Sequence, residues 1–386
     1  MRAVSPRAAR LAVAALGLAA CSETTDPRAL APESLQPALK ARTIYPAKRE
    51  EWRSDITSDV DSTMVPLVFR ASGTTVALLQ ANPTRISQFE LHGHGMLLSA
   101  RPGRVDSVLN AQVPRDLVAP VELSRATEDG HVDVIDSASS ILMRESLGGF
   151  VFRRDLPLLR GGSYRLCTVT PATLLHVRAL GENRALEAYT LTAIAAEDSL
   201  IGRHRIVGET AARLRFGGGD NRHCLLLTSR EVLIVSAPDS ARAGAPPRIQ
   251  RLRRPGDGAA PRQIGEPPAL AGSAVEHPFI VDASIVDGGY VVLVGLENDR
   301  QGRVIDYYNA KGEYLQSAML PFTASAMAGS GPRFLVLHQD AKYKWWLSSW
   351  LTPMAARGAT APPDPPSVTR APEKQLFEPA RRSATP

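Results

Sequence analysis

Short apolar stretches alternate with turn residues along most of the chain, and this pattern predicts an all-β protein. Between about residues 47 and 353, runs rich in Val, Ile, Leu, Tyr and Phe are separated by clusters of Gly, Asp, Asn and Pro. No amphipathic pattern extends beyond three helical turns. Short apolar runs bounded by turn residues are typical of β-strands in sandwiches, barrels and propellers.

Two stretches repeat the same order of elements, namely turn, strand, turn, strand, glycine turn and strand. The first copy consists of Glu128-Asp129-Gly130-His131, Val132–Asp136, Ile141–Glu145, Gly148-Gly149 and Phe150–Pro157. The second copy consists of Asp287-Gly288-Gly289, Tyr290–Leu296, Val304–Tyr308, Lys311-Gly312 and Tyr314–Pro321. Both copies end in Leu-Pro, which indicates a structural repeat.

Such a unit predicts a four-stranded antiparallel blade that buries its two faces only by packing against neighbouring blades. Applied along the chain, this template predicts six blades, near residues 60–105, 115–160, 162–208, 212–255, 276–321 and 322–353. The last blade is one strand short. We expect an N-terminal segment, Arg42–Tyr45 or Trp52–Ile56, to supply that strand. A sandwich of two sheets is the alternative architecture.

The repeat resembles that of bacterial six-bladed β-propeller lipoproteins related to NHL-repeat proteins. The resemblance rests on Asp129-Gly130 followed by Val132–Asp136, and on the run Ile305–Tyr314. It implies a propeller with four strands per blade. The first, third and fourth predicted blades depart from the pattern because they lack the Asp-Gly entry turn.

The N-terminus has the organisation of an export signal. Arg2, Arg7 and Arg10 precede an apolar segment, Leu11–Ala20, that is too short for a membrane span of roughly 20 residues. The run Leu18-Ala19-Ala20-Cys21 resembles the lipobox of bacterial lipoproteins, which implies cleavage before Cys21 and lipid attachment to its thiol. An ordinary secretory signal is the alternative.

This resemblance predicts a protein of the bacterial cell envelope. Ser22 follows the cysteine where an Asp would favour the inner membrane, so we expect an outer-membrane anchor. The predicted segments are a signal peptide at 1–20, a flexible tether at 21–46, a propeller at 47–353 and a disordered Pro/Ala-rich tail at 354–386. A Pro/Gly-rich insertion is expected near 236–272.

Removing the leader changes the charge argument. The formal charge of +6 falls to +3 once the three leader arginines are gone, so the mature chain is only weakly basic. An exported, weakly basic protein is not expected to bind nucleic acid. The densest basic cluster, formed by Arg248, Arg251, Arg253 and Arg254, is typical of a solvated loop or strand edge.

Cysteine usage is compatible with export. Cys167 and Cys224 remain after lipidation of Cys21, and they form either one disulfide or two buried thiols. Neither lies in a Cys-x-x-Cys motif, so a redox or zinc site is not indicated.

Candidate sites are few, and each has a structural alternative. His92 and His94 flank a glycine and are weak metal candidates, with a hairpin or loop as the alternative. Gly217–Asn221 lacks the residues of a phosphate-binding loop and predicts a turn. Asp129, Asp133 and Asp136 alternate as calcium ligands do, but their neighbours are typical of a core strand.

A cluster of tryptophans near the end of the repeats is the best indication of a ligand. Trp345, Trp346 and Trp350 lie within a few residues of Tyr343, and exposed indoles would form a platform for a sugar ring or peptide. Packing between the last and first blades is the alternative, because Trp345 points away from the other two on a strand.

The sequence predicts no cofactor and no catalytic residue. No nucleophile elbow is present, so a lipid-anchored binding or scaffold module for a protein, peptide or glycan is favoured. The alternative is a propeller enzyme, a lyase or a metal-dependent lactonase, with its site in the central channel.

Overall fold

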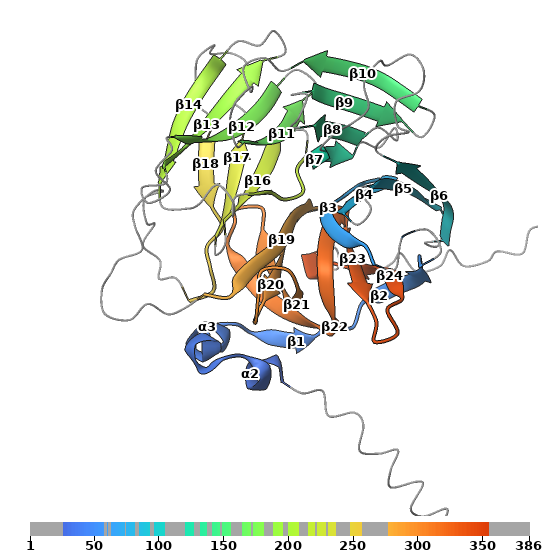
Figure 1. The fold of residues 1–386 in the computed structure, drawn as a ribbon. Coiled ribbons are helices and arrows are strands. Elements are labelled where there is room, and N and C mark those ends of the chain that lie inside the picture. The colour runs from blue at the N-terminus through green and yellow to red at the C-terminus, as the bar shows by residue number, and fades with distance from the viewer. Residues whose placement is uncertain are drawn as a thin grey trace, which may run out of the picture.

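The computed structural model describes residues 26–354 with gaps in the loops, the widest at 105–119, 237–247 and 257–276. Strands between residues 85 and 207 are described mainly by their backbone pairing. Nearly all regular structure is β-strand, which confirms the all-β prediction (Figure 1). No helix in the described part is long and apolar enough to cross a bilayer. The predicted signal peptide, Cys21 and the C-terminal tail from residue 355 lie outside the described residues.

Four separate sheets contain four strands each, joined in sequence order by antiparallel pairing. The first two sheets comprise β3 (Val65–Ser72), β4 (Thr75–Ala81), β5 (Arg85–His92) and β6 (Met96–Arg104), and then β7 (Pro120–Ala126), β8 (Val132–Asp136), β9 (Ile141–Ser146) and β10 (Gly149–Asp155). The next two comprise β11 (Tyr164–Thr170), β12 (Thr173–Leu180), β13 (Ala188–Ala195) and β14 (Leu200–Val207), and then β15 (Arg215–Phe216), β16 (His223–Leu227), β17 (Val232–Ser236) and β18 (Arg248–Arg251). Their bounds follow the first four predicted repeats.

The fifth sheet has eight strands, because one long strand belongs to both of its halves. Its strands are β19 (Phe279–Val286), β20 (Gly289–Gly295), β21 (Gly302–Asn309), β22 (Tyr314–Ser330), β23 (Arg333–Gln339), β24 (Trp345–Leu351) and two N-terminal strands. The first part of β22 pairs with β21, and its second part pairs with β23. The last two predicted repeats are therefore joined without a break at Pro321.

An N-terminal strand completes the second half of this sheet. β2 (Glu50–Asp55) pairs antiparallel with β24, so that Arg53 lies opposite Ser348. The expectation that Trp52–Ile56 supplies the missing strand is confirmed. The other candidate segment contributes β1 (Ile44–Pro46), which pairs in parallel with β22 through Ser317–Met319.

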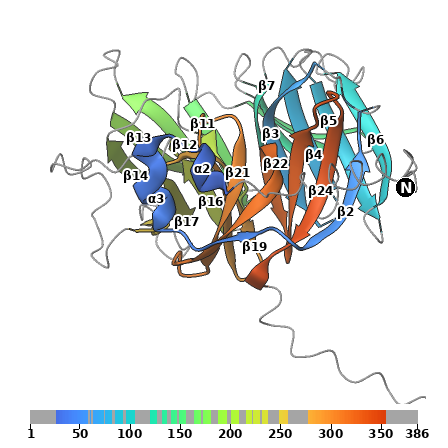
Figure 2. The same cartoon turned by 90° about the horizontal axis from the view of Figure 1, so that it is seen from below.

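Residues 27–46, which we call the N-terminal strap, are folded where the sequence predicts a flexible tether over 21–46. The strap contains α2 (Pro27–Leu30), a 3-10 turn at Glu33–Leu35, α3 (Gln36–Lys40) and β1. Viewed from below, the strap crosses the near side of the molecule in blue, and its strand β1 runs past the eight-stranded sheet toward β2 (Figure 2). Leu35, Ala38 and Leu39 are buried, so the segment packs against the sheet instead of standing away from it.

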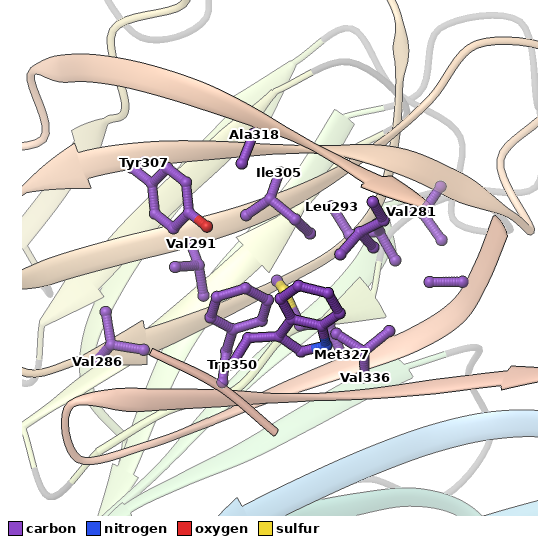
Figure 3. Packing of buried hydrophobic residues seen from close by; sticks show 13 residues of the cluster. Val281, Val286, Val291, Leu293, Ile305, Tyr307, Ala318, Met327, Val336 and Trp350 are labelled. Atoms are coloured by element: carbon purple, nitrogen blue, oxygen red, sulfur yellow. The ribbon is translucent and has the colours of Figure 1, made fainter. Parts of the chain in front are cut away.

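The two faces of the eight-stranded sheet pack into different hydrophobic cores. One core, drawn in Figure 3, joins its halves through Val291, Tyr307, Met327, Val336 and Trp350. A second core joins its second half to the β3–β6 sheet. A third core joins its first half to the β15–β18 sheet. Because side chains alternate along a strand, β19–β21 contribute to the first and third cores and β22–β24 contribute to the first and second. β20 is buried at every position.

Two further regions resolve alternatives left by the sequence. Cys167 on β11 and Cys224 on β16 form a disulfide that joins two sheets, with Cα atoms 6.4 Å apart. Arg248–Arg251 forms β18 and pairs with β17, so the predicted insertion at 236–272 contains an edge strand. Arg251 and Arg254 lie 3.3 and 3.6 Å from Glu231 carboxylate oxygens, which supports the strand-edge interpretation of this basic cluster.

We expect the Cys167→Ser/Cys224→Ser double variant to be less stable than the native protein. The disulfide closes a loop with a sequence separation of 57 residues, and a loop of that length corresponds to about 4 kcal/mol in the chain-entropy model. Denaturant unfolding of both proteins, with the reduced native protein as control, measures the loss. Equal free energies of unfolding would show that the crosslink contributes nothing.

Candidate functional site

The first strands of successive sheets lie side by side. β3 contacts β7, β7 contacts β11, and β11 contacts β15; β22 contacts both β19 and β3, and β16 contacts β19. Figure 1 shows these strands on the inner side of the sheets. Side chains of the inner strands that point away from the hydrophobic cores therefore meet in the middle of the molecule.

A group of polar side chains occupies this position, and we call Arg70, Arg215, Asp282 and Ser284 the central cluster. Arg70 on β3 is 3% exposed and donates hydrogen bonds to the carbonyls of Phe69 at 2.9 Å and Phe216 at 2.6 Å. Arg215 on β15 donates to carbonyls of β19, those of Ile280 and Val281. The two guanidinium groups thus connect three inner strands.

Asp282 and Ser284 form hydrogen bonds to a further inner strand, β22. Asp282 accepts hydrogen bonds from the backbone N–H groups of Ala283 at 2.9 Å and Met327 at 3.1 Å. Ser284 Oγ accepts one from Gly329 N at 2.6 Å. Both side chains lie on β19 and reach β22, so they fix the spacing of these two strands.

Backbone segments at two glycines, Gly218 and Gly329, pack closely against the strand that carries Asp282 and Ser284. A Cβ atom at Gly218 would overlap the side chain of Ser284, and one at Gly329 would overlap the carbonyl of Ile285. Gly218 N also donates to Ala283 O at 2.8 Å. Only glycine permits this approach of strand to strand.

Burial determines the protonation behaviour of Asp282. Removal from water raises the pKa of this carboxyl above its usual range, against the opposing charges of Arg70 and Arg215. A raised carboxyl pKa is what a general acid requires. Both carboxylate oxygens, however, are engaged by backbone N–H groups, so the observed role of the cluster is to hold inner strands together.

Asp220 and His223 form a polar pair where the chain passes from β15 to β16. Asp220 accepts from the backbone N–H groups of Arg222 and His223, each at 2.6 Å, and both its oxygens lie 3.1 Å from His223 Nδ1. The hydrogen bond to Asp220 raises the pKa of His223. Burial favours a higher pKa for Asp220, but its hydrogen bonds lower it overall. About a third of the His223 side chain is exposed.

The structure separates the tryptophans that the sequence groups. Trp345 and Trp350 are each 3% exposed and belong to two different cores of those described above. Trp346 is partly buried and donates through its indole N–H to Asp340 at 3.1 Å. Burial leaves neither Trp345 nor Trp350 free to stack on a ligand, and packing is the role observed for both.

The other predicted candidates fall mostly outside the described side chains. His92 is the last residue of β5, whereas His94 lies outside the described residues. Asp133 and Asp136 lie within β8, in which Val134 is fully buried. In the described part, no group of three or more His, Cys, Asp or Glu side chains is arranged to hold a metal ion. Gly217–Asp220 lies between β15 and β16, as predicted for a turn.

The sequence reasoning missed a buried histidine, His338 on β23. This side chain is 2% exposed, and neither ring nitrogen has a hydrogen-bond partner. It stacks on Phe322 with ring centroids 3.6 Å apart, and the guanidinium of Arg53 lies 5.0 Å from the centre of the same Phe322 ring. Burial and the nearby Arg53 charge lower the pKa of His338 to about 4, which Asp340 opposes only weakly.

The sequence does contain a local indication of the buried ionisable residues. Asp282 and Asp306 each interrupt an apolar run in the sequence, and His338 directly follows one. A charged or ionisable residue inside an otherwise apolar strand is stable only if it is paired, hydrogen-bonded or neutral. The interruptions therefore mark the residues, although not their partners.

Comparisons with known proteins provide structural neighbours only. No protein-family model matches the chain, and no curated protein matches its sequence. Virginiamycin B lyase from Staphylococcus aureus shares 12% identity over 78% of this chain and 88% of its own, with a TM-score of 0.39.

Two further solved structures are similar to a comparable degree. A member of the DUF4221 family from Bacteroides vulgatus has 8% identity and a TM-score of 0.42, covering 78% of this chain and 98% of its own. A gluconolactonase from Xanthomonas campestris has 9% identity and a TM-score of 0.38, covering 80% and 98%. These neighbours are β-propeller proteins. Similarities of this size carry no information about activity.

We expect Ser284→Ala to destabilise the protein by roughly 1–3 kcal/mol, because it leaves the buried N–H of Gly329 without its acceptor. Ser330→Ala on β22, next to Gly329, is the matched control, since it removes an exposed hydrogen bond to Gly73 O. Urea unfolding of the two variants provides the comparison. Equal small losses would contradict a structural role for the central cluster.

We expect the free energy of unfolding to decrease as the pH falls, because His338 is buried in its neutral form. Its folded-state pKa of about 4 lies below the ordinary value of 6.5, so the unfolded chain binds more protons between these values. Its contribution is complete above pH 6.5 and decreases toward pH 4, by roughly 3 kcal/mol in total. His338→Phe keeps a ring against Phe322 but removes the titration. Its free energy of unfolding should therefore vary less over this range, and identical slopes for both proteins would refute the assignment.

Proposed function

We propose that the protein is an exported, lipid-anchored β-propeller of six four-stranded blades that acts as a binding or scaffold module for a protein, peptide or glycan of the cell envelope. The blade count is supported by the four separate sheets together with the two halves of the eight-stranded sheet. The side-by-side contacts of their first strands support a ring. The pairing of β2 with β24 supports closure of that ring by the N-terminus.

Export and anchoring rest on two observations. The sequence Leu18-Ala19-Ala20-Cys21 resembles a lipobox, and Cys167 and Cys224 are joined in a disulfide. Disulfides persist in oxidising compartments outside the cytoplasm. An outer-membrane anchor, implied by Ser22, is part of the same proposal.

The observation that carries the binding role is how the central cluster uses its polar atoms. Asp282 and Ser284 bind the protein's own backbone on the adjacent inner strand β22, and Arg70 on β3 binds the backbone of β15 in the fourth sheet. A propeller enzyme would instead direct such groups toward a substrate in the channel. Binding is therefore assigned to the outer surfaces and loops.

An enzymatic role is the second candidate, and one observation favours it. Asp220 holds Nδ1 of His223, which is how a carboxylate orients an acid–base imidazole. In that case a lyase or lactonase type of reaction would depend on His223, and a metal would have to come from residues outside the described part.

Lipidation is tested first. In cells supplied with labelled palmitate, the native protein should incorporate label and sediment with membranes, because the thiol of Cys21 carries the lipid. Cys21→Ser should incorporate none and appear in the soluble exported fraction. Ser22→Ala, which keeps the thiol, is the control. A native protein without label would refute the anchoring proposal.

The choice between binding and catalysis needs a second experiment. Crosslinking of the membrane-bound protein should capture the same envelope partner for native protein and for His223→Gln. Turnover of lactones or glycans by the purified native protein, lost in His223→Gln, together with no specific crosslinked partner, would favour the enzyme.

A further inference from the structure

The N-terminal strap is attached to the sheet by a buried ion pair. Arg42 and Asp306 are 5% and 1% exposed, and Arg42 Nη2 lies 2.8 Å from Asp306 Oδ2. Arg42 Nε lies 3.1 Å from both carboxylate oxygens, and Nη1 donates to Ala38 O at 2.9 Å. A bidentate arginine–carboxylate pair is among the strongest and most directional contacts in proteins.

Further hydrogen bonds surround this ion pair. Ser317 Oγ donates to Asp306 at 2.6 Å and lies 2.8 Å from the hydroxyl of Tyr314. That hydroxyl accepts from Thr43 N at 3.1 Å, and Ser317 N donates to Thr43 O at 2.8 Å. Breaking a contact of Arg42, Asp306 or Ser317 leaves a buried charge or polar group without its partner, so these contacts fix the position of the strap.

Because the strap is fixed to the sheet, only a short chain segment connects the folded protein to its proposed lipid. Only six residue steps separate Cys21 from Pro27, the first residue of α2. Fully extended, they span about 20 Å. A tether running freely to Pro46 would span roughly 90 Å. Given lipid at Cys21, α2 therefore stays within about 20 Å of the membrane surface.

The exposed chemistry of the strap and its immediate flanks suits a phospholipid surface. Leu30 is 50% exposed and Tyr45 is 52% exposed. Apart from the paired Arg42, residues 26–49 carry four basic and two acidic side chains, a difference of +2: Arg28, Lys40, Lys48 and Arg49 against Asp26 and Glu33. Tyrosine, exposed leucine and excess basic residues favour the interface of an anionic bilayer.

We propose that the strap is the membrane-facing surface of the protein, where it contacts anionic phospholipid and fixes which side of the molecule faces the bilayer. This inference rests on the proposed lipid anchor at Cys21. It places the sheet β11–β14, at the opposite end of the molecule from α2 in Figure 1, away from the membrane. Partners would then reach the protein from that side.

The test uses the lipidated full-length protein in vesicles of phosphatidylethanolamine and phosphatidylglycerol. Leu30→Cys and, separately, Thr173→Cys on β12 each introduce the only free thiol, because Cys21 carries lipid and the other two cysteines are bridged. A fluorophore on each is quenched by spin-labelled headgroups. Quenching at residue 30 should exceed quenching at residue 173 by about twofold or more. The segment between Cys21 and Pro27 keeps α2 within about 20 Å of the membrane surface.

Two changes distinguish the effect of the short segment after Cys21 from the effect of the strap's exposed side chains. Inserting about 20 Gly/Ser residues after Thr24 adds about 70 Å of reach without altering the strap, and the quenching difference should then shrink. The same insertion after Pro386 is the control and should have no effect. Replacing phosphatidylglycerol by phosphatidylcholine should weaken quenching at 30, whereas unchanged quenching would refute the role of anionic lipid.

The outcomes distinguish this inference from the proposed function. Equal quenching at both positions in a palmitate-labelled protein would overturn the membrane-facing strap and leave the lipid anchor intact. Absence of palmitate at Cys21 would overturn the anchor itself. Arg42→Met, checked for folding by its unfolding transition, should release the strap and reduce the difference between the two positions.

Discussion

The antiparallel pairing of β2 with β24 is the constraint on which the rest of the molecule depends. It joins the first and last parts of the folded chain, because an N-terminal strand becomes the last strand of the eight-stranded sheet. Beyond β2 toward the N-terminus, the chain has to cross the outside of that sheet, where β1 and the Arg42–Asp306 pair hold it. One strand pairing thus joins the two ends of the folded chain and determines where the N-terminal segment leaves it.

Polar groups in the interior serve the same purpose as the strand pairing. Asp282 and Ser284 tie β19 to β22, and Arg70 reaches from β3 to the backbone of β15. Buried polar groups are costly unless they are hydrogen-bonded, so these contacts hold the strands that they connect in fixed positions. The Asp220–His223 pair is the part of the described structure best suited to acid–base chemistry, because it is bonded and still partly exposed.

The strand positions were largely predictable, because an apolar run bounded by turn residues forms a strand from local information alone. The repeats ending at Leu156-Pro157 and Leu320-Pro321 identified β8–β10, β20 and β21 with small errors at the ends, whereas β22 continues past the predicted end at Pro321 to Ser330. The tether prediction for 21–46 was wrong over residues 27–46, because a polar, proline-bearing segment without periodicity gave no sign of the carboxylate that holds Arg42. The tryptophan platform was not supported, because alternation along β24 places Trp345 and Trp350 in different cores.

By itself, the sequence determined the all-β class, the approximate bounds of each sheet, and the positions of cysteines and charges. Tertiary structure decided that Cys167 meets Cys224, that Arg42 meets a carboxylate 264 residues away, and that His338 is buried against Phe322. The reason is physical. Strand formation follows from the alternation and turn chemistry of neighbouring residues, whereas ion pairs, disulfides and stacked rings need two groups whose proximity only the packed sheets create.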